Sequence, residues 1–313
     1  MAWKAIVIAD VLDDVRSALK TLAVDKEEAL TTFEELWEKV LAALRKGVSA
    51  SIKTALKRTA ARLSRIPLKC ALEEAKQVAI VGEVYVRRDR LSRRGLTDWL
   101  AEKGFVSRIA PINEWVWYVD YVIKKKLWGE DLTRLDRIGL AIRRFFQSRY
   151  EREIKKIMER SNLYHFEMTE VSRTFAFAEQ LVNPRLRGEA ILTVGLALRE
   201  ILDTACGVIS IGPFGCMPSR VAEAILTEMM TMEGKRAVTP RGDRVLMLDG
   251  NGPLPFLSIE TDGNAFPQLI EARLEAFCLQ AARAHDKMMA ARSAYGRHAR
   301  AKEKVTHRRK RGK

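Results

Sequence analysis

The sequence VAIVG, at residues 78–82, is a short continuous apolar run that ends in glycine. Residues 91–103 then show a helical pattern up to Gly104, and a second apolar run follows at residues 105–112. An apolar run of this length followed by a helix is typical of a strand buried in a parallel sheet. We therefore expect a strand–helix–strand unit over residues 78–112.

The same alternation recurs in the second half of the chain. Apolar runs at residues 207–214 and 255–259 are followed by helical patterns over residues 219–232 and 267–284. Three repeats of strand, loop and helix predict an α/β fold, with a Rossmann-like parallel sheet and flanking helices.

The first part of the chain has a different pattern. Three segments before Pro67 have the apolar spacing of amphipathic helices: residues 11–23, 26–45 and 51–63. Proline cannot continue a helix interior, so Pro67 ends this region. We expect a helical N-terminal segment over residues 1–75, a Rossmann-like module over residues 76–284 and a basic tail over residues 285–313.

The charge is concentrated at the C-terminus. The 313 residues are 47% apolar and 30% charged, which is typical of a globular protein rather than a disordered or fibrous one. From Ala281 onward, twelve basic residues face two acidic ones, so this segment holds ten of the fifteen net positive charges. One interpretation is an arm that binds nucleic acid or another acidic partner. The other is a solvated tail that binds nothing specific.

The composition also limits the compartment and the kind of site. Four scattered cysteines do not make a disulfide scaffold, and no run is long and apolar enough to cross a membrane. The N-terminus lacks the pattern of a signal peptide. We therefore expect a cytoplasmic protein without membrane contact. The sequence has no phosphate-binding glycine loop of the ATPase type and no paired-cysteine zinc motif.

Ligands in open parallel sheets bind at the carboxyl ends of the strands, which directs attention to three loops. In the first, GEVYVRRD at residues 82–89, Arg87 and Arg88 follow a strand and precede a helix. Two guanidinium groups beside a helix N-terminus favour an anion site. The alternative is a surface pair of arginines neutralised by Glu83 and Asp89.

The second loop, IGPFGCMPS at residues 211–219, contains a constrained cysteine. Glycines and prolines surround Cys216, which directly precedes a predicted helix. The partial positive charge of a helix N-terminus stabilises a thiolate, the reactive and metal-binding form. The alternative is a small buried apolar residue, as is common for a free cysteine.

The third loop, SIETDGNAFP at residues 258–267, has three polar side chains past a strand end: Glu260, Asp262 and Asn264. Such carboxylates can bind a cation, act as acid and base, or orient a ligand. Alternatively, Asp262 and Asn264 cap the following helix while Glu260 pairs with an arginine.

Taken together and in this order, four strings resemble the C-terminal dehydratase-like module of the 2-hydroxyacyl-CoA dehydratase and acyl-CoA dehydratase activase superfamily, of the benzoyl-CoA reductase/2-hydroxyglutaryl-CoA dehydratase type. They are GEVYVRRDRLSRRGLTDWLAEKGF, APINEWVWY, IGPFGCMPSRVAEAIL and PFLSIETDGNAFPQLIEARLEAF. The resemblance runs from about Val78 to Ala282, and FGCMPS and ETDGNAFPQLIEARLEAF are its most specific parts.

The resemblance implies an oxygen-sensitive, ATP-dependent system in which an activase passes a low-potential electron to a dehydratase-like component that acts on acyl-CoA-type substrates. It implies that Cys216 is a ligand of an iron–sulphur cluster, by the family's pattern a [4Fe–4S] cluster. It also marks Arg87, Arg88, Glu260, Asp262 and Asn264 as candidate cofactor-binding residues, although no chemical step is assigned to them.

This sequence departs from the family in its cysteines and in its nucleotide motifs. Cys70, Cys206 and Cys278 lie outside the resembling strings, and a cubane cluster takes about four ligands. We therefore expect Cys216 to share a cluster with a cysteine-bearing dehydratase-like or ATP-dependent activase subunit, or with a second copy of this chain. The alternative is a cluster-free scaffold or interaction protein with the same fold and a basic tail.

Overall fold

The computed structural model describes residues 1–129, 132–243, 246, 248, 252–264 and 266–311, with side chains described as far as Ala294. The elements are α1 (Ala2–Leu22), α2 (Lys26–Lys46), α3 (Ser49–Leu63), the short 3-10 helix η1 (Leu72–Glu74), β1 (Lys76–Gly82), α4 (Leu96–Glu102), β2 (Phe105–Ile109), α5 (Asn113–Lys125), α6 (Arg134–Glu159), α7 (Val171–Ala176), α8 (Ala190–Glu200), β3 (Gly207–Pro213), α9 (Met217–Met229), α10 (Met232–Val238), β4 (Phe256–Thr261) and α11 (Gln268–Arg311).

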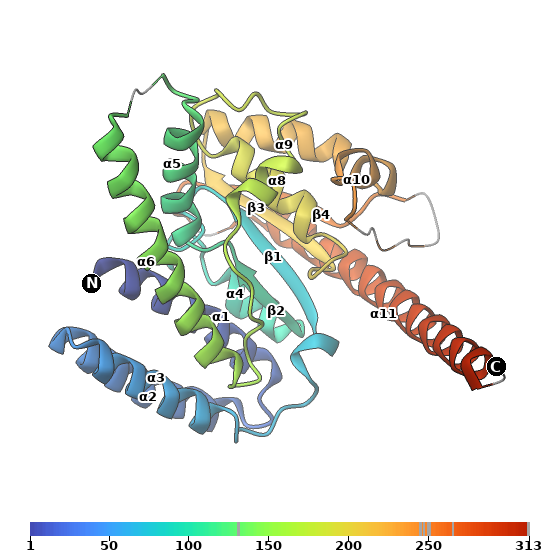
Figure 1. The fold of residues 1–313 in the computed structure, drawn as a ribbon. Helices are drawn as coiled ribbons and strands as arrows, with labels where there is room; N and C mark the ends of the chain where they lie inside the picture. The colour runs from blue at the N-terminus through green and yellow to red at the C-terminus, as the bar shows by residue number, and fades with distance from the viewer. Residues whose placement is uncertain (130–131, 244–245, 247, 249–251, 265, 312–313) are drawn as a thin grey trace.

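The four strands form one parallel sheet in the order β2-β1-β3-β4. In its register, Ile80 of β1 pairs with Ile109 of β2 and Ile209 of β3. Helices α8 and α9 cover one face, and α4 and α11 cover the other, so the inner strands β1 and β3 are buried on both sides (Figure 1). This burial explains why their sequences are continuous apolar runs rather than alternating patterns. The predicted α/β fold with a Rossmann-like parallel sheet is confirmed.

The sheet has a topological switch point between β1 and β3. The chain adds β2 on one side of β1, and then adds β3 and β4 on the other side. Gly82 ends β1 there with a φ of 112°, and a Cβ at this position would lie 2.0 Å from the carbonyl oxygen of Ile211 in β3. Only glycine permits this conformation and this close approach of two backbones. The loops after β1 and β3 therefore begin side by side.

The N-terminal helices form a second layer with its own core. The predicted helices are present, and α1, α2, α3 and α6 enclose an apolar cluster that also includes Val106 of β2. Helix α1 lies along the outer edge of β2, where Ser17 Oγ accepts from the Ser107 N–H at 2.9 Å and Thr21 donates to the Phe105 carbonyl at 3.1 Å. These hydroxyls satisfy backbone groups that an edge strand leaves open.

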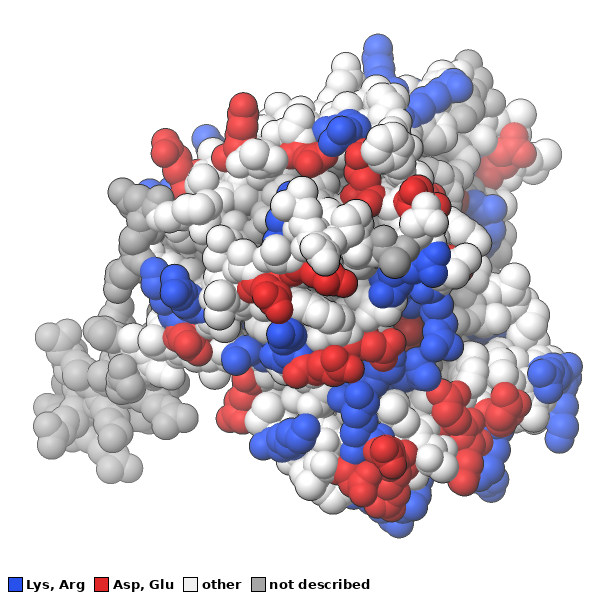
Figure 2. All heavy atoms as spheres, turned by 180° about the vertical axis from the view of Figure 1, so that it is seen from behind, with Lys and Arg blue, Asp and Glu red and all other residues white. Residues whose placement is uncertain are grey.

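Two predicted helices are shorter than their sequence patterns indicate. The pattern over residues 91–103 becomes helix only at Leu96, because Asp89 accepts from the Ser92 N–H and hydroxyl and holds the preceding residues in turns. The apolar spacing over residues 166–182 also predicts a helix, but in the structure these residues are helical only in α7. At the C-terminus, the backbone of the predicted basic tail continues α11 as far as Arg311, but the side chains from residue 295 onward lie outside the described residues. On the face shown in Figure 2, basic and acidic side chains of the folded body lie intermixed.

Candidate functional site

The three loops selected from the sequence meet at the carboxyl edge of the sheet. Thr261, at the end of β4, donates its hydroxyl to the Ser92 carbonyl at 3.1 Å. The Phe214 N–H donates to the Thr261 carbonyl at 3.1 Å, so the end of β4 bonds to both of the other loops. We refer to this region, Ser92 with residues 214–217 and 260–264, as the carboxyl edge.

Cys216 is the residue of the carboxyl edge that precedes α9. Its backbone is extended, its N–H donates to the Pro213 carbonyl at 3.1 Å, and Gly215 before it has a φ of 72°, which favours glycine. The side chain of Cys216 is partly exposed, and its neighbours Phe214 and Met217 are 77% and 55% exposed. The thiol thus lies at an accessible helix N-terminus between two exposed apolar side chains.

Glu260 is the acidic residue closest to this loop. Its carboxylate pairs with Arg220 Nε at 3.1 Å and accepts from the Gly215 N–H at 3.4 Å. The ion pair therefore connects the end of β4 to the first turns of α9, directly behind Cys216. The structure thus contains the arginine partner that the alternative interpretation of Glu260 requires.

Asp262 and Asn264 are exposed and bond to each other. Asp262 accepts from the backbone N–H of Asn264 at 2.9 Å and from its side-chain amide at 2.7 Å. The backbone N–H bond is the main cause of the lowered pKa of Asp262. This is an Asx turn, which explains the conformation without a ligand. Binding of a cofactor by this pair stays a prediction.

Arg87 does not reach the carboxyl edge, because its guanidinium group is buried behind the loop. It donates to the carbonyls of Gly82 at 2.8 Å and Pro111 at 3.1 Å and lies 3.6 Å from a Glu114 carboxylate oxygen. Burial lowers the pKa of Arg87 and raises that of Glu114. Arg87 joins the ends of β1 and β2 to α5, a structural role that leaves little of it for a ligand.

Arg88 points toward α1. Its guanidinium group bonds to the carbonyls of Ile109 and Ala110 and pairs with Asp13 at 2.9 Å and Asp10 at 3.2 Å. Burial alone would lower its pKa, but the two carboxylates outweigh burial and raise it. Neither arginine is a surface residue neutralised by Glu83 and Asp89, and their predicted role in anion binding stays untested.

A group of charged residues lies inside the fold and was not predicted from the sequence. This interior charge cluster comprises Asp14, Arg108, Glu167, Arg199 and Glu200, which line a cavity of about 70 Å³ between α1, α8 and the sheet. Arg108 pairs with Glu200 at 3.1 Å, and Arg199 pairs with Glu167 at 2.7 Å. The available signal was a charged residue inside an apolar run, as Arg108 is in the strand sequence FVSRI.

The pKa values in this cluster diverge. Burial would raise the pKa of Glu200, but Arg108 and Arg199 outweigh burial and lower it to about 2. Asp14 has an oxygen without a hydrogen-bond partner, and burial raises its pKa to about 7. Glu200 is therefore held ionised at neutral pH, whereas Asp14 changes its protonation state there.

The cysteines do not gather around Cys216. Cys206 lies before β3, at the opposite end of that strand, and Cys278 lies on α11. Both are buried, and burial raises their pKa values to about 12 and 11. Among the described residues, no group of three or more potential ligands could hold a metal ion. A cluster at Cys216 would need its remaining ligands from another chain.

No family model, curated protein or solved structure matches this chain. In the described part of the chain, no helix has the length and hydropathy needed to cross a bilayer.

Proposed function

We propose that this chain is a dehydratase-like or activase-associated subunit of a cytoplasmic, ATP-dependent iron–sulphur electron-transfer system that acts on acyl-CoA-type substrates. In this proposal Cys216 provides one thiolate ligand to a [4Fe–4S] cluster that is shared with a partner chain. The observation that carries the proposal is the position of Cys216, which is partly exposed at the N-terminus of α9 on the carboxyl edge. The resemblance of the FGCMPS string supports the same residue.

The chemistry of the donor set fits a shared cluster and does not fit one held by this chain alone. Cys206 and Cys278 are buried at the other end of β3 or on α11, and a cubane cluster takes about four ligands. The partner would therefore be a cysteine-bearing dehydratase-like or activase subunit, or a second copy of this chain. When bound, such a cluster supplies one-electron transfer at low potential.

The surroundings of Cys216 suit an interface. Phe214 and Met217 flank the thiol and are largely exposed, so a partner that covers them gains apolar burial and excludes water from the cluster. The Glu260 carboxylate accepts from the Gly215 N–H and pairs with Arg220, so the loop that carries Cys216 has contacts to both β4 and α9.

The test is iron and acid-labile sulphide per chain, with the visible spectrum, after anaerobic purification from cells that co-express the product of a neighbouring gene. We expect iron and sulphide in the wild type and their loss in Cys216→Ala. Cys70→Ala is the matched control, because Cys70 is also partly exposed but lies in the N-terminal segment, and it should retain the iron.

The absence of iron from the wild-type complex, or its retention in Cys216→Ala, would contradict the proposal. A stable, colourless complex whose assembly does not depend on Cys216 would instead favour the cluster-free interaction protein.

A further inference from the structure

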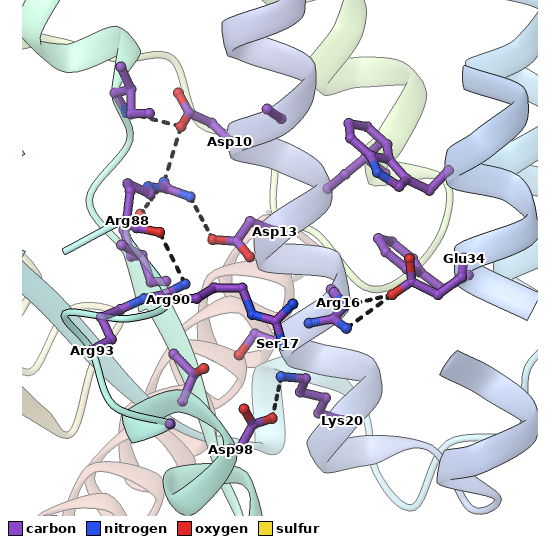
Figure 3. Close-up of a pocket in the computed structure, with 18 residues that line it drawn as sticks. Asp10, Asp13, Arg16, Ser17, Lys20, Glu34, Arg88, Arg90, Arg93 and Asp98 are labelled. Carbon is purple, nitrogen blue, oxygen red and sulfur yellow. Dashed lines mark hydrogen bonds and ion pairs between the residues drawn. The ribbon is translucent and has the colours of Figure 1, made fainter. Parts of the chain in front are cut away.

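A second cavity lies away from Cys216, between α1, α2 and the loop that joins β1 to α4. Its volume is about 440 Å³. Figure 3 shows Arg88, Arg90 and Arg93 reaching from the loop toward α1, with Arg16 and Lys20 on the facing helix. We call this cavity the α1 groove. It is rich in charges of both signs, so its chemistry depends on which of them already have partners.

The four carboxylates that line the α1 groove are all engaged. Glu34 pairs with Arg16 at 3.0 Å, and Asp98 pairs with Lys20. Asp13 and Asp10 both pair with Arg88.

Asp10 is further held by the backbone. Its carboxylate also accepts two N–H bonds at 3.0 Å, from Ile112 and Asn113. The acidic side of the groove is therefore satisfied by Arg16, Lys20 and Arg88.

Arg93 remains without a carboxylate. It is only 6% exposed, its Nη2 donates to the Arg88 carbonyl at 3.3 Å, and its Nε has no hydrogen-bond partner. Among the described residues, no Asp or Glu oxygen lies within ion-pair distance of Arg93. Burial is the main cause that lowers the pKa of Arg93. The charges of Arg88 and Arg90 also lower it, and the charges of Asp13 and Asp98 act in the opposite direction. A buried guanidinium group with open donors and no ion-pair partner is costly.

Arg90 is the second open cation of the groove. It is exposed and, within the described part of the chain, makes no ion pair or hydrogen bond. It lies three residues before Arg93 in the same loop. Two neighbouring guanidinium groups with free donors together carry the charge that one phosphate dianion would neutralise, and the planar fork of arginine matches phosphate oxygens.

We propose that the α1 groove binds a phosphate group, held by Arg93 and Arg90. The opposite wall, which includes Phe33 and Trp37 of α2, leaves apolar space beyond the arginines for the organic part of a phosphate ester. The ligand is thus either inorganic phosphate or the phosphate of a small organic molecule. This site is separate from Cys216 and does not depend on a cluster there.

The test is calorimetric titration of the full chain with two probes, orthophosphate and phenyl phosphate, at low ionic strength and at a pH where both are dianions. We expect saturable binding of at least one probe. Arg93→Gln and Arg90→Gln should each weaken it about tenfold or more, because each removes charge-assisted hydrogen bonds. Tighter binding of phenyl phosphate would identify an organic ester as the ligand class, and equal binding would identify the free ion.

Arg152→Gln is the matched control, because Arg152 is an exposed residue of α6 and its loss changes the net charge equally. It should bind both probes like the wild type. The proposal is overturned if neither probe binds the wild type saturably, or if Arg152→Gln weakens binding as much as Arg90→Gln. If Arg93→Gln fails to fold, the exposed Arg90 variant decides the question alone.

Discussion

The carboxyl edge and the interior charge cluster use their polar groups in opposite ways. In the interior, Arg108 of β2 and Arg199 of α8 both pair with Glu200, so these charged groups find their partners within the fold. At the carboxyl edge, Asp262 and Asn264 bond only within their own turn, and Cys216 is partly exposed. The difference teaches that the charged groups of the interior are bonded between elements of the fold, whereas the Asp262–Asn264 pair at the carboxyl edge bonds only locally.

The largest expected effect comes from breaking the interior cluster. Glu200→Ala removes the buried carboxylate that pairs with both Arg108 and Arg199 and leaves them only Glu167, which is more exposed. Loss of one partner of a buried pair costs about 3–5 kcal/mol of unfolding free energy. Urea unfolding followed by circular dichroism measures the loss. Glu153→Ala is the control, because it breaks the exposed pair with Lys53 and should cost about 1 kcal/mol or less. Equal losses in the two variants would remove the contrast between interior and surface.

The next expected effect is a pH dependence of stability, which differs in sign between Asp14 and Glu200 of the interior cluster. The pKa of Asp14 is raised to about 7 in the folded protein, so its contribution to stability is present below about pH 4 and is lost as the pH rises through 7. The pKa of Glu200 is lowered to about 2, so its contribution is present above about pH 4.5 and is lost only as the pH falls toward 2.

Asp14→Asn isolates the first of these contributions. The difference in unfolding free energy between wild type and variant should shift against the wild type between pH 4 and pH 7, by up to about 1.4 kcal/mol per pH unit. Urea titrations at several pH values measure it. A difference that stays constant over this range would show that Asp14 is ionised in the fold, as an ordinary surface carboxylate is.

The sequence was sufficient to predict the sheet because both faces of β1 and β3 are buried, which leaves a continuous apolar pattern. It also placed the three loops at one edge, since parallel strands end on the same side. The direction of each side chain was not predictable. Arg87, Arg88 and Arg93 are near neighbours in one loop, yet the first bonds to α5, the second pairs with α1 and the third has no carboxylate partner.

Tertiary packing gives each of those arginines a different environment, and the local sequence pattern does not indicate which one. Asp10 and Asp13, which engage Arg88, lie more than seventy residues away in the chain. Distance in the sequence also hid the interior cluster, in which Arg108 of β2 pairs with Glu200 of α8, 92 residues away. Local patterns therefore located the loops and the position of Cys216 on a helix N-terminus, whereas the assignment of each charge required the fold.

The smallest expected effect is at the carboxyl edge, and its smallness is informative. Asp262→Ala removes two bonds to Asn264 in an exposed turn, so it should change the unfolding free energy by about 0.5 kcal/mol or less. Urea unfolding beside Glu200→Ala measures it. A loss of 2 kcal/mol or more would mean that folding depends on this turn as it does on the interior cluster. A change in unfolding free energy near zero would mean that the fold does not depend on the Asp262–Asn264 bonds. A partner that binds around Cys216 could then break these bonds at little cost in stability.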